Sequence, residues 1–477
     1  MGVVLLENLQ LWLPELILSV GAMAVLLAGA WSKPEGASRP TAPVGLAGTA
    51  IAAAAVALAH APSPGPLFSG LIQLDPVAAV FRWIALGVVA LTMPMALSSK
   101  DIQPRWTAEC LGLLLLVGVG LMLMASANHL LMAYLSMELV SLSSYALSGM
   151  TRDARSSEAA LKYLLYGALT SGIMLFGMSL VFGLTGELSL PAIGQAVASL
   201  DPGRARALAA VTALLLAGLA FKISMVPFHM WTPDVYEGAP IAVTAMLSVG
   251  PKAAGLALLF RIMGDLEPLW GFIAPTFLLL TVVTMTFGNL VALAQTNVKR
   301  LLAYSTIGQV GYLLIGFAVN TQAGLEAVAL YLVAYLFMNL GAFACVTAVV
   351  NATGSEMLET FRGLGRRNPW LAFCMTLFLL SLAGMPPLIG FIGKFMLFGS
   401  AIETRQLGLA VAGVINSAIA LYYYMNIVRL MYLHPPASQE RLVPALSLRL
   451  AVLVCAVSTV GLGLFPSRLL AWISRIG

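Results

Sequence analysis

The chain has 477 residues, of which 60% are hydrophobic and only 9% are charged, and its formal net charge is +5. A water-soluble domain averages about a quarter charged residues, so this composition excludes an ordinary soluble globule. The basic residues are scattered through short polar breaks instead of forming one patch, which argues against nucleic acid as a partner and for a lipid bilayer.

Apolar runs of about 20 residues recur along the whole chain, and this is the length of α-helix that crosses a hydrocarbon layer of about 30 Å. They predict an all-α integral membrane protein with about fourteen transmembrane helices. The predicted spans are 11–30, 42–61, 75–98, 108–124, 128–148, 161–185, 206–231, 239–262, 270–292, 299–318, 323–350, 368–402, 406–431 and 447–470.

Lysine and arginine are unevenly shared between the two sets of loops. If the spans alternate in direction, one set holds most of them, Lys299, Arg300 and Arg362 among them. The positive-inside rule assigns that set to the cytoplasm. We therefore expect a multi-pass protein of the bacterial inner membrane with both termini on the periplasmic side.

The predicted seventh and twelfth helices are interrupted in a similar way, by Phe221 to Pro227 and by Gly384 to Gly390. Proline removes a backbone donor and clashes with the preceding turn, so we expect a break in each helix. Paired breaks are typical of transporters built from inverted repeats, here of five helices each. The expected segments are an N-terminal three-helix segment at 1–107, repeats at 108–262 and 263–431, and a C-terminal helix at 432–477.

A few charges remain inside the predicted spans, where each costs at least about 2.5–3.5 kcal/mol near the bilayer centre. Such residues pair, face water or carry function, so they are the first functional candidates. They are Arg82, Glu138, Lys162, Lys222, Lys252 and Lys394.

Burial disfavours the charged form of a lysine ammonium, and a nearby carboxylate favours it. A Lys–Glu pair that opens and closes can therefore load or release a proton, and several lysines in a row would form a relay. The alternative is structural: static ion pairs, or side chains that snorkel to the headgroups. Snorkelling is an equal alternative for Lys162 and the preferred interpretation for Arg82, whereas Lys222, Lys252 and Lys394 favour function.

Several polar side chains are further candidates for a proton path. His229 follows the first break and has a side chain suited to proton transfer. It could equally anchor the helix end at the membrane surface together with Trp231. Interhelical packing is the alternative for the others. They are Tyr134, Ser305, Gln309 and Tyr312.

Neither the cysteines nor any nucleotide motif indicates a cofactor. The four cysteines are widely separated in apolar surroundings, which predicts buried small side chains and not a metal or iron–sulfur site. No Walker loop, dinucleotide fingerprint or zinc-helix motif is present in the sequence. We expect no cofactor and no metal on this chain.

Two long motifs resemble the antiporter-like subunits of respiratory complex I. Residues 221–240 read FKISMVPFHMWTPDVYEGAP, and residues 299–312 read KRLLAYSTIGQVGY, as in the tenth helix of that family. Within the family, the opening Leu13 to Leu16, the modest length and Lys394 resemble the subunit N branch of NADH-quinone oxidoreductase. Subunit L would carry a long lateral helix after this point, and subunit M typically has glutamate in place of Lys394.

The resemblance implies a proton-translocating subunit of an enzyme complex, with Glu138 and Lys222 as the input pair, Lys252 as the central relay and Lys394 as the output. It also implies that electrons pass from NADH to quinone on partner subunits, which would hold FMN, the iron–sulfur clusters and the quinone. Membrane subunits M, K and J would be neighbours. Many relatives have histidine where Gln309 stands; a glutamine can still hold a water molecule.

Two other functions stay open from the sequence. The chain could belong to a multisubunit cation/proton antiporter, whose chains share the lysines near the broken helices. It could also be a scaffold subunit that conducts nothing. The electron donor of the complex, whether NADH, ferredoxin or a reduced deazaflavin, is also left open.

Overall fold

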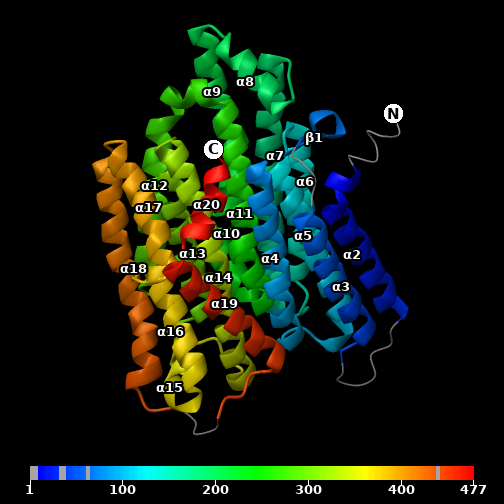
Figure 1. The fold of residues 1–477 in the computed structure, drawn as a ribbon, viewed down its shortest axis with the longest axis vertical. Helices are drawn as coiled ribbons and strands as arrows, with labels where there is room; N and C mark the ends of the chain where they lie inside the picture. Colours follow the sequence, from blue (N-terminus) through cyan, green and yellow to red (C-terminus); the bar gives the residue numbers. More distant parts are fainter. Residues whose placement is uncertain (1–8, 32–38, 61–64, 437–440, 477) are drawn as a thin grey trace. The chain divides into compact units, whose positions relative to one another are not determined.

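A computed structural model describes residues 9–31, 39–60, 65–436 and 441–476. Figure 1 shows a chain of helices with one small hairpin. The longer helices are α2 (Leu13–Trp31), α3 (Thr41–Ala59), α4 (Pro76–Ser98), α5 (Thr107–Ser126), α6 (Leu130–Ser148), α7 (Ala154–Thr185), α9 (Pro202–Ile223), α11 (Ile241–Asp265), α12 (Trp270–Ala292), α13 (Val298–Ala318), α14 (Gln322–Thr353), α16 (Pro369–Ala383), α17 (Ile389–Glu403), α18 (Leu407–Leu433) and α19 (Leu446–Leu464). The short elements are β1 (Gly65–Leu67), β2 (Ile72–Leu74), α8 (Leu190–Ala198), α10 (Trp231–Gly238), α15 (Leu364–Arg367) and α20 (Ser467–Ile473).

The described helices confirm the predicted membrane fold. Thirteen helical segments are long and apolar enough to cross a bilayer, and the remaining predicted span corresponds to the successive helices α16 and α17. One boundary differs clearly, because α7 begins at Ala154 and not near residue 161. Asp153 caps this helix: its Oδ1 accepts a 2.7 Å hydrogen bond from the Ser156 amide and so extends the helix into a polar stretch.

Both predicted helix breaks are present. The first separates α9, which ends at Ile223, from α10, and the second separates α16 from α17. In each case the residue directly after the helix adopts a left-handed backbone conformation, Ser224 with φ 65° and Gly384 with φ 89°. That conformation ends a helix, and the prolines that follow prevent it from resuming at once.

The chain forms two compact units. Unit 1 comprises residues 1–90, 102–223 and 250–277, and unit 2 comprises 91–101, 224–249 and 278–477. In unit 1, α5 packs against α2, α3 and α6, and α7 packs against α6 and α9. The antiparallel hairpin of β1 and β2 pairs Gly65 with Leu74, and its side chains Leu67 and Ile72 pack with Ala78.

In unit 2, α14 is the central helix. It contacts α13, α16, α17 and α19, and most of its residues are buried (Figure 1). A helix that is apolar all round is stable only when other helices cover it on every side. Small residues permit the closest packing: a Cβ added to Gly288 of α12 would lie 2.4 Å from the backbone nitrogen of Gly308 on α13.

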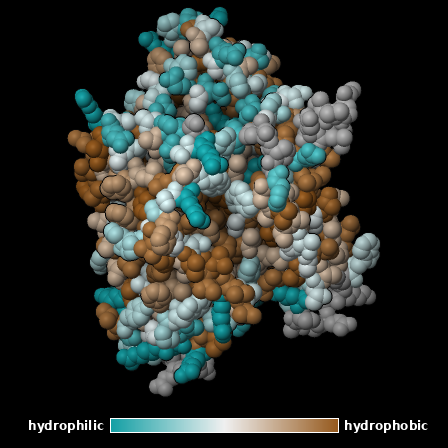
Figure 2. All heavy atoms as spheres, viewed as in Figure 1, coloured by the Kyte–Doolittle hydropathy of each residue, from teal (hydrophilic) through white to brown (hydrophobic). Residues whose placement is uncertain are grey.

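The exposed surface of the long helices is largely apolar. Exposed side chains include Leu164, Leu169 and Phe176 on α7 and Val411 and Val414 on α18. Figure 2 shows polar side chains gathered over α8 and near α15, and apolar side chains over much of the surface along the long helices. Lipid or a neighbouring membrane subunit satisfies such a surface, and water does not.

The structure corrects the prediction for Arg82. We expected its side chain to snorkel to the headgroups, but it is 3% exposed and forms an ion pair with Glu15, which is 1% exposed, at 2.5 Å. Arg261 lies within α11 and pairs with Asp75 at 2.9 Å. In both cases a carboxylate from a distant segment replaces the water that the arginine loses.

Candidate functional site

Lys222 and Glu138 both lie in unit 1. Lys222 is on α9 just before the first break, and Glu138 is on α6. Lys222 is in the last turn of α9, 1% exposed, and its Nζ donates a 2.7 Å hydrogen bond to Ser141 Oγ of α6. Glu138 is on the same helix as Ser141, and its Oε1 accepts a 2.5 Å hydrogen bond from Ser171 Oγ of α7. The carboxylate lies close enough to the ammonium for electrostatic interaction. The structure therefore brings together the two groups that were expected to interact.

Lys252 belongs to the same unit and is fully buried on α11. It lies within electrostatic range of Lys222. Helices α9 and α11 approach closely beside these lysines. A Cβ added to Gly255 of α11 would lie 2.6 Å from Ile223 Cγ2 and 3.8 Å from Lys222 Cβ, both on α9. Glycine at 255, one turn after Lys252, thus lets α11 pack against the end of α9.

Lys394 lies in unit 2, on α17 after the second break, and is 3% exposed. Its Nζ donates to the Ala383 carbonyl at the end of α16 at 3.2 Å and to Ser417 Oγ at 3.3 Å. The same nitrogen is 4.1 Å from the centre of the Tyr312 ring. A ring face, a hydroxyl and a helix-end carbonyl each stabilise an ammonium without adding a full negative charge.

A chain of polar side chains continues from Lys394 through unit 2. Tyr312 OH accepts a 3.0 Å hydrogen bond from Asn289 Nδ2, and Asn289 Oδ1 accepts one of 3.0 Å from Tyr423. The adjacent Tyr424 shares a 2.5 Å hydrogen bond with Ser305. The two tyrosine rings are in contact, so these groups form one buried polar cluster.

Gln309 is part of the same cluster. Its Nε2 donates to Tyr424 OH at 3.2 Å and to the Leu382 carbonyl at 3.1 Å, and its Oε1 accepts a hydrogen bond from Tyr331. The glutamine therefore bonds to two tyrosine hydroxyl groups and one backbone carbonyl, which come from three helices. Of the predicted polar residues, Ser305, Gln309 and Tyr312 are brought together with Lys394.

The three remaining predicted residues make other contacts. The Lys162 side chain is 40% exposed and pairs with Glu158 one turn earlier on α7, at 2.9 Å. His229 is buried in the segment after the first break, with its ring edge-on to Phe287 at 4.5 Å. Tyr134 lies one turn before Glu138 on α6 and interacts with it electrostatically.

Sequence reasoning did not single out Ser141 or Ser171, the partners of Lys222 and Glu138. The spacing of three residues between Glu138 and Ser141 on one helix face was the available signal for Ser141. The sequence also assigns Lys299 to a loop, whereas its side chain is 2% exposed. Its Nζ bonds to Glu356 at 2.8 Å and to the Ala239 carbonyl at 2.6 Å.

The chemistry available at these sites is proton exchange at amines, a carboxylate and hydroxyl groups. Among the residues that the structure describes, no group of three or more His, Cys, Asp or Glu side chains is arranged to hold a metal ion. The four cysteines are buried, as predicted.

Comparison with known proteins assigns the family. Residues 127–420, which include both helix breaks, the buried lysines and the cluster members Asn289, Ser305, Gln309 and Tyr312, match the family model described as NADH:quinone oxidoreductase/Mrp antiporter, TM. The chain belongs to this family. It is 41% identical over 465 residues to NADH-quinone oxidoreductase subunit N of Anaeromyxobacter sp. (strain Fw109-5), covering 91% of this chain and 90% of that relative. The expected resemblance to the subunit N branch is confirmed.

Solved structures of the NADH:quinone oxidoreductase/Mrp antiporter family agree in fold. A chain of respiratory complex I from Thermus thermophilus, solved with bound aureothin, superposes with a TM-score of 0.82 at 33% identity, covering 97% of this chain and 100% of that one. A chain of the Mrp complex from Dietzia sp. DQ12-45-1b gives a TM-score of 0.83 at 22% identity, covering 100% and 97%. The latter likeness shows the fold alone. The comparisons thus favour a membrane subunit of a complex I-type oxidoreductase over the cation/proton antiporter alternative.

Proposed function

We propose that this chain translocates protons across the membrane as the subunit N-type member of an NADH-quinone oxidoreductase. Glu138 and Lys222 take up the proton, Lys252 relays it and Lys394 releases it towards the periplasm. The observation that carries this proposal is that three lysines are buried in apolar helices, and that Lys222 and Lys394 bond there to a hydroxyl and a carbonyl group. Static packing seldom needs so many buried amines, because each must be desolvated.

The local geometry supports a role for the Glu138–Lys222 pair as a switch. Each member has a serine partner of its own, Ser171 for the carboxylate and Ser141 for the ammonium. A serine hydroxyl can both donate and accept, so it can serve either protonation state of the lysine. The pair can therefore strengthen or weaken its direct interaction without leaving a buried charge without a partner.

The cluster beside Lys394 supplies groups for a path in unit 2. Tyr312, Gln309 and Ser305 present hydroxyl and amide groups that can hold water and pass a proton along it. Tyr134, Lys162 and His229 are proposed as accessory members of the relay. Lys162 makes an exposed pair with Glu158, so its variant is the least disruptive test of that extension.

The redox reaction belongs to partner subunits in this proposal. Electrons pass there from NADH to quinone through FMN and iron–sulfur clusters, and the energy reaches this chain through its membrane neighbours, subunits of the M, K and J types. The lysine and arginine distribution supports an orientation with both termini periplasmic. The paired breaks support two inverted repeats, at 108–262 and 263–431.

The test is proton pumping in vesicles that contain the assembled complex with Lys222→Met or Lys394→Met. NADH oxidation by quinone and acidification of the vesicle interior are measured on the same preparation. Lys100→Met is the matched control, since it removes the same charge from an exposed position after α4. Loss of acidification in both variants, with an assembled complex and an active control, is the expected result.

Normal pumping with both lysines replaced would overturn the proposal and leave a scaffold. A pumping activity that depends on sodium and continues without NADH or quinone would point to the antiporter alternative. Variants Lys162→Met and His229→Phe then decide whether the relay includes the accessory members, because each keeps the bulk of the side chain and removes its proton-accepting group.

A further inference from the structure

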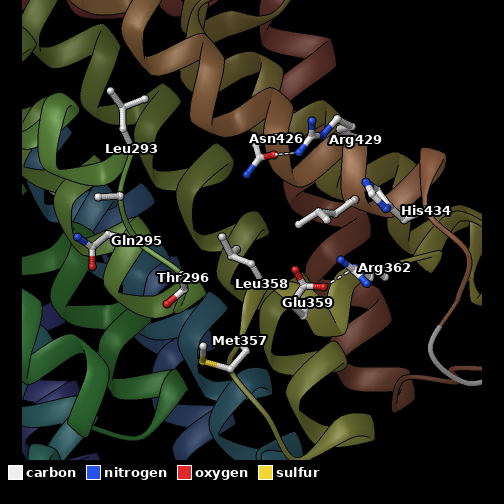
Figure 3. Close-up of a pocket in the computed structure, with 12 residues that line it drawn as sticks. Leu293, Gln295, Thr296, Met357, Leu358, Glu359, Arg362, Asn426, Arg429 and His434 are labelled. Atoms are coloured by element: carbon white, nitrogen blue, oxygen red, sulfur yellow. Dashed lines mark hydrogen bonds and ion pairs between the residues drawn. The ribbon is translucent and has the colours of Figure 1, made fainter.

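A cavity of about 390 Å³ lies in unit 2, away from the buried lysines. Its walls come from the segment between α12 and α13, from the 3-10 helix η4 (Leu358–Phe361) and from the C-terminal end of α18 (Figure 3). Neither the proton path nor the family motifs account for it. Its size is within the range of small-molecule sites, which begins at roughly 300 Å³.

Basic and amide groups gather on one side of this cavity. Figure 3 shows Arg429, His434 and Arg362 on the same side, with Asn426 beside them. Arg429 donates a 3.0 Å hydrogen bond to Asn426 Oδ1, which holds its guanidinium at the rim. Glu359 pairs with Arg362 and neutralises its charge. Arg429 therefore gives the cavity a net positive charge, which a protonated His434 would increase.

The opposite side mixes uncharged polar and apolar side chains, Gln295 and Thr296 with Leu293 and Met357 (Figure 3). Leu293 at the end of α12 and Met357 before η4 line the cavity and are 40% and 43% exposed. Leu358 and Leu430 also line the cavity, and these four apolar side chains are called its apolar wall. A ligand that fits has an anionic group at one end and apolar atoms at the other.

The position of the cavity along the helices shows at which level of the bilayer it lies. The helix α12 ends at Ala292 and α18 ends at Leu433, so the cavity lies where two transmembrane helices leave the hydrocarbon layer. Exposed Tyr432 lies two residues before His434, as expected for the aromatic belt at the membrane surface. One turn earlier on each helix, Leu290 and Met425 are exposed and apolar. Apolar chains leaving the cavity would follow these residues into the bilayer.

We infer that this cavity binds the phosphate headgroup of an anionic phospholipid. The Arg429 and Arg362 guanidinium groups and the Asn426 amide are donors suited to phosphate oxygens. The apolar wall contacts the first part of the acyl chains, which continue into the membrane. The charge favours an anionic lipid over a zwitterionic one. The apolar wall favours a lipid over dissolved phosphate, which would gain nothing from it.

The experiment measures binding of dihexanoyl phosphatidylglycerol to the delipidated, assembled complex by native mass spectrometry. Wild type is compared with Arg429→Gln and with Arg366→Gln. Arg366 is an exposed arginine four residues after Arg362 and does not line the cavity, so it is the matched control. Removing a charged hydrogen bond donor predicts about tenfold weaker binding at one site in Arg429→Gln. The control should bind like wild type.

Two further ligands identify the source of the phosphate. Dihexanoyl phosphatidylcholine should bind more weakly than phosphatidylglycerol and should be less sensitive to Arg429→Gln. Inorganic phosphate should not displace the lipid at equal concentration. Equal binding of both lipids, displacement by phosphate alone, or an equal loss in Arg366→Gln would each overturn the inference.

A second variant keeps the inference testable if Arg429→Gln prevents assembly. Thr296→Trp enlarges an exposed side chain that lines the cavity and leaves its charges in place. It should abolish the same single binding event by filling the space. An assembled Thr296→Trp complex that binds phosphatidylglycerol as wild type does would show that the lipid lies elsewhere.

Discussion

The Lys222 ammonium donates a 2.7 Å hydrogen bond to Ser141 Oγ, and Ser141 lies one helical turn after Glu138 on α6. Residues three apart share a face of a helix, so one face of α6 presents both a hydroxyl and a carboxylate to the end of α9. The hydrogen bond to Ser141 therefore holds the Lys222 ammonium against the helix that carries Glu138.

Replacing Ser141 with alanine should slow proton pumping by about tenfold, because a buried ammonium loses a hydrogen bond worth roughly 1.5–3 kcal/mol. Acidification of vesicles containing the assembled complex measures the effect. Ser148→Ala is the matched control, since Ser148 is buried on the same helix and its hydroxyl bonds to the Ser144 carbonyl of that helix. Equal rates in both variants would remove Ser141 from the mechanism.

Substitutions at Tyr312 should separate its ring from its hydroxyl. Tyr312→Phe keeps the ring 4.1 Å from Lys394 and loses the hydrogen bond from Asn289, whereas Tyr312→Leu loses both. A buried cation–π contact is worth about 2 kcal/mol, so pumping should fall further in Tyr312→Leu, by about tenfold or more. If the two variants pump equally, the ring contact has no part in holding the lysine.

Gly384→Ala should impair the second break in two ways. Its φ of 89° disfavours any side chain by about 1–2 kcal/mol, and the new Cβ would lie 2.9 Å from Lys394 Cδ. Gly186→Ala is the matched control: Gly186 also ends a helix with positive φ, 74°, but has open space around its Cβ. Both variants should lower the thermal unfolding temperature in detergent, and only Gly384→Ala should also reduce pumping. Unchanged pumping in Gly384→Ala would mean that Lys394 tolerates displacement.

Breaking the Arg82–Glu15 pair should strongly destabilise unit 1. Arg82→Met leaves the buried Glu15 carboxylate, and Glu15→Gln the buried Arg82 guanidinium, without its counter-charge, which typically costs about 3–5 kcal/mol. Glu158→Gln is the control, since its pair with Lys162 is exposed and worth at most about 1 kcal/mol. Thermal unfolding of the purified complex and the yield of assembled complex report the difference. A double variant Arg82→Met with Glu15→Leu should recover much of the lost stability, because no buried charge remains without its counter-charge. If it does not, lost packing and not the unpaired charge accounts for the destabilisation.

The sequence alone was sufficient for the membrane fold and for the identity of the charged candidates. Hydrocarbon excludes charges and unpaired backbone groups, so the spans, the breaks near Pro227 and Pro386 and the buried lysines follow from local composition. The same reasoning misassigned Arg82, because a residue near a helix end reaches either headgroups or a buried partner. Only the packing of α2 against its neighbours brings Glu15 to it.

Which side chain holds each lysine was decided by the tertiary structure. Ser141 is 81 residues from Lys222, and Tyr312 lies on a different helix from Lys394. Such contacts depend on the rotation and crossing of helices, and these are set by close packing at small residues such as Gly255 and Gly308. Local sequence determines which residues enter the membrane and where helices break, whereas partners across helices arise only when all the helices pack together.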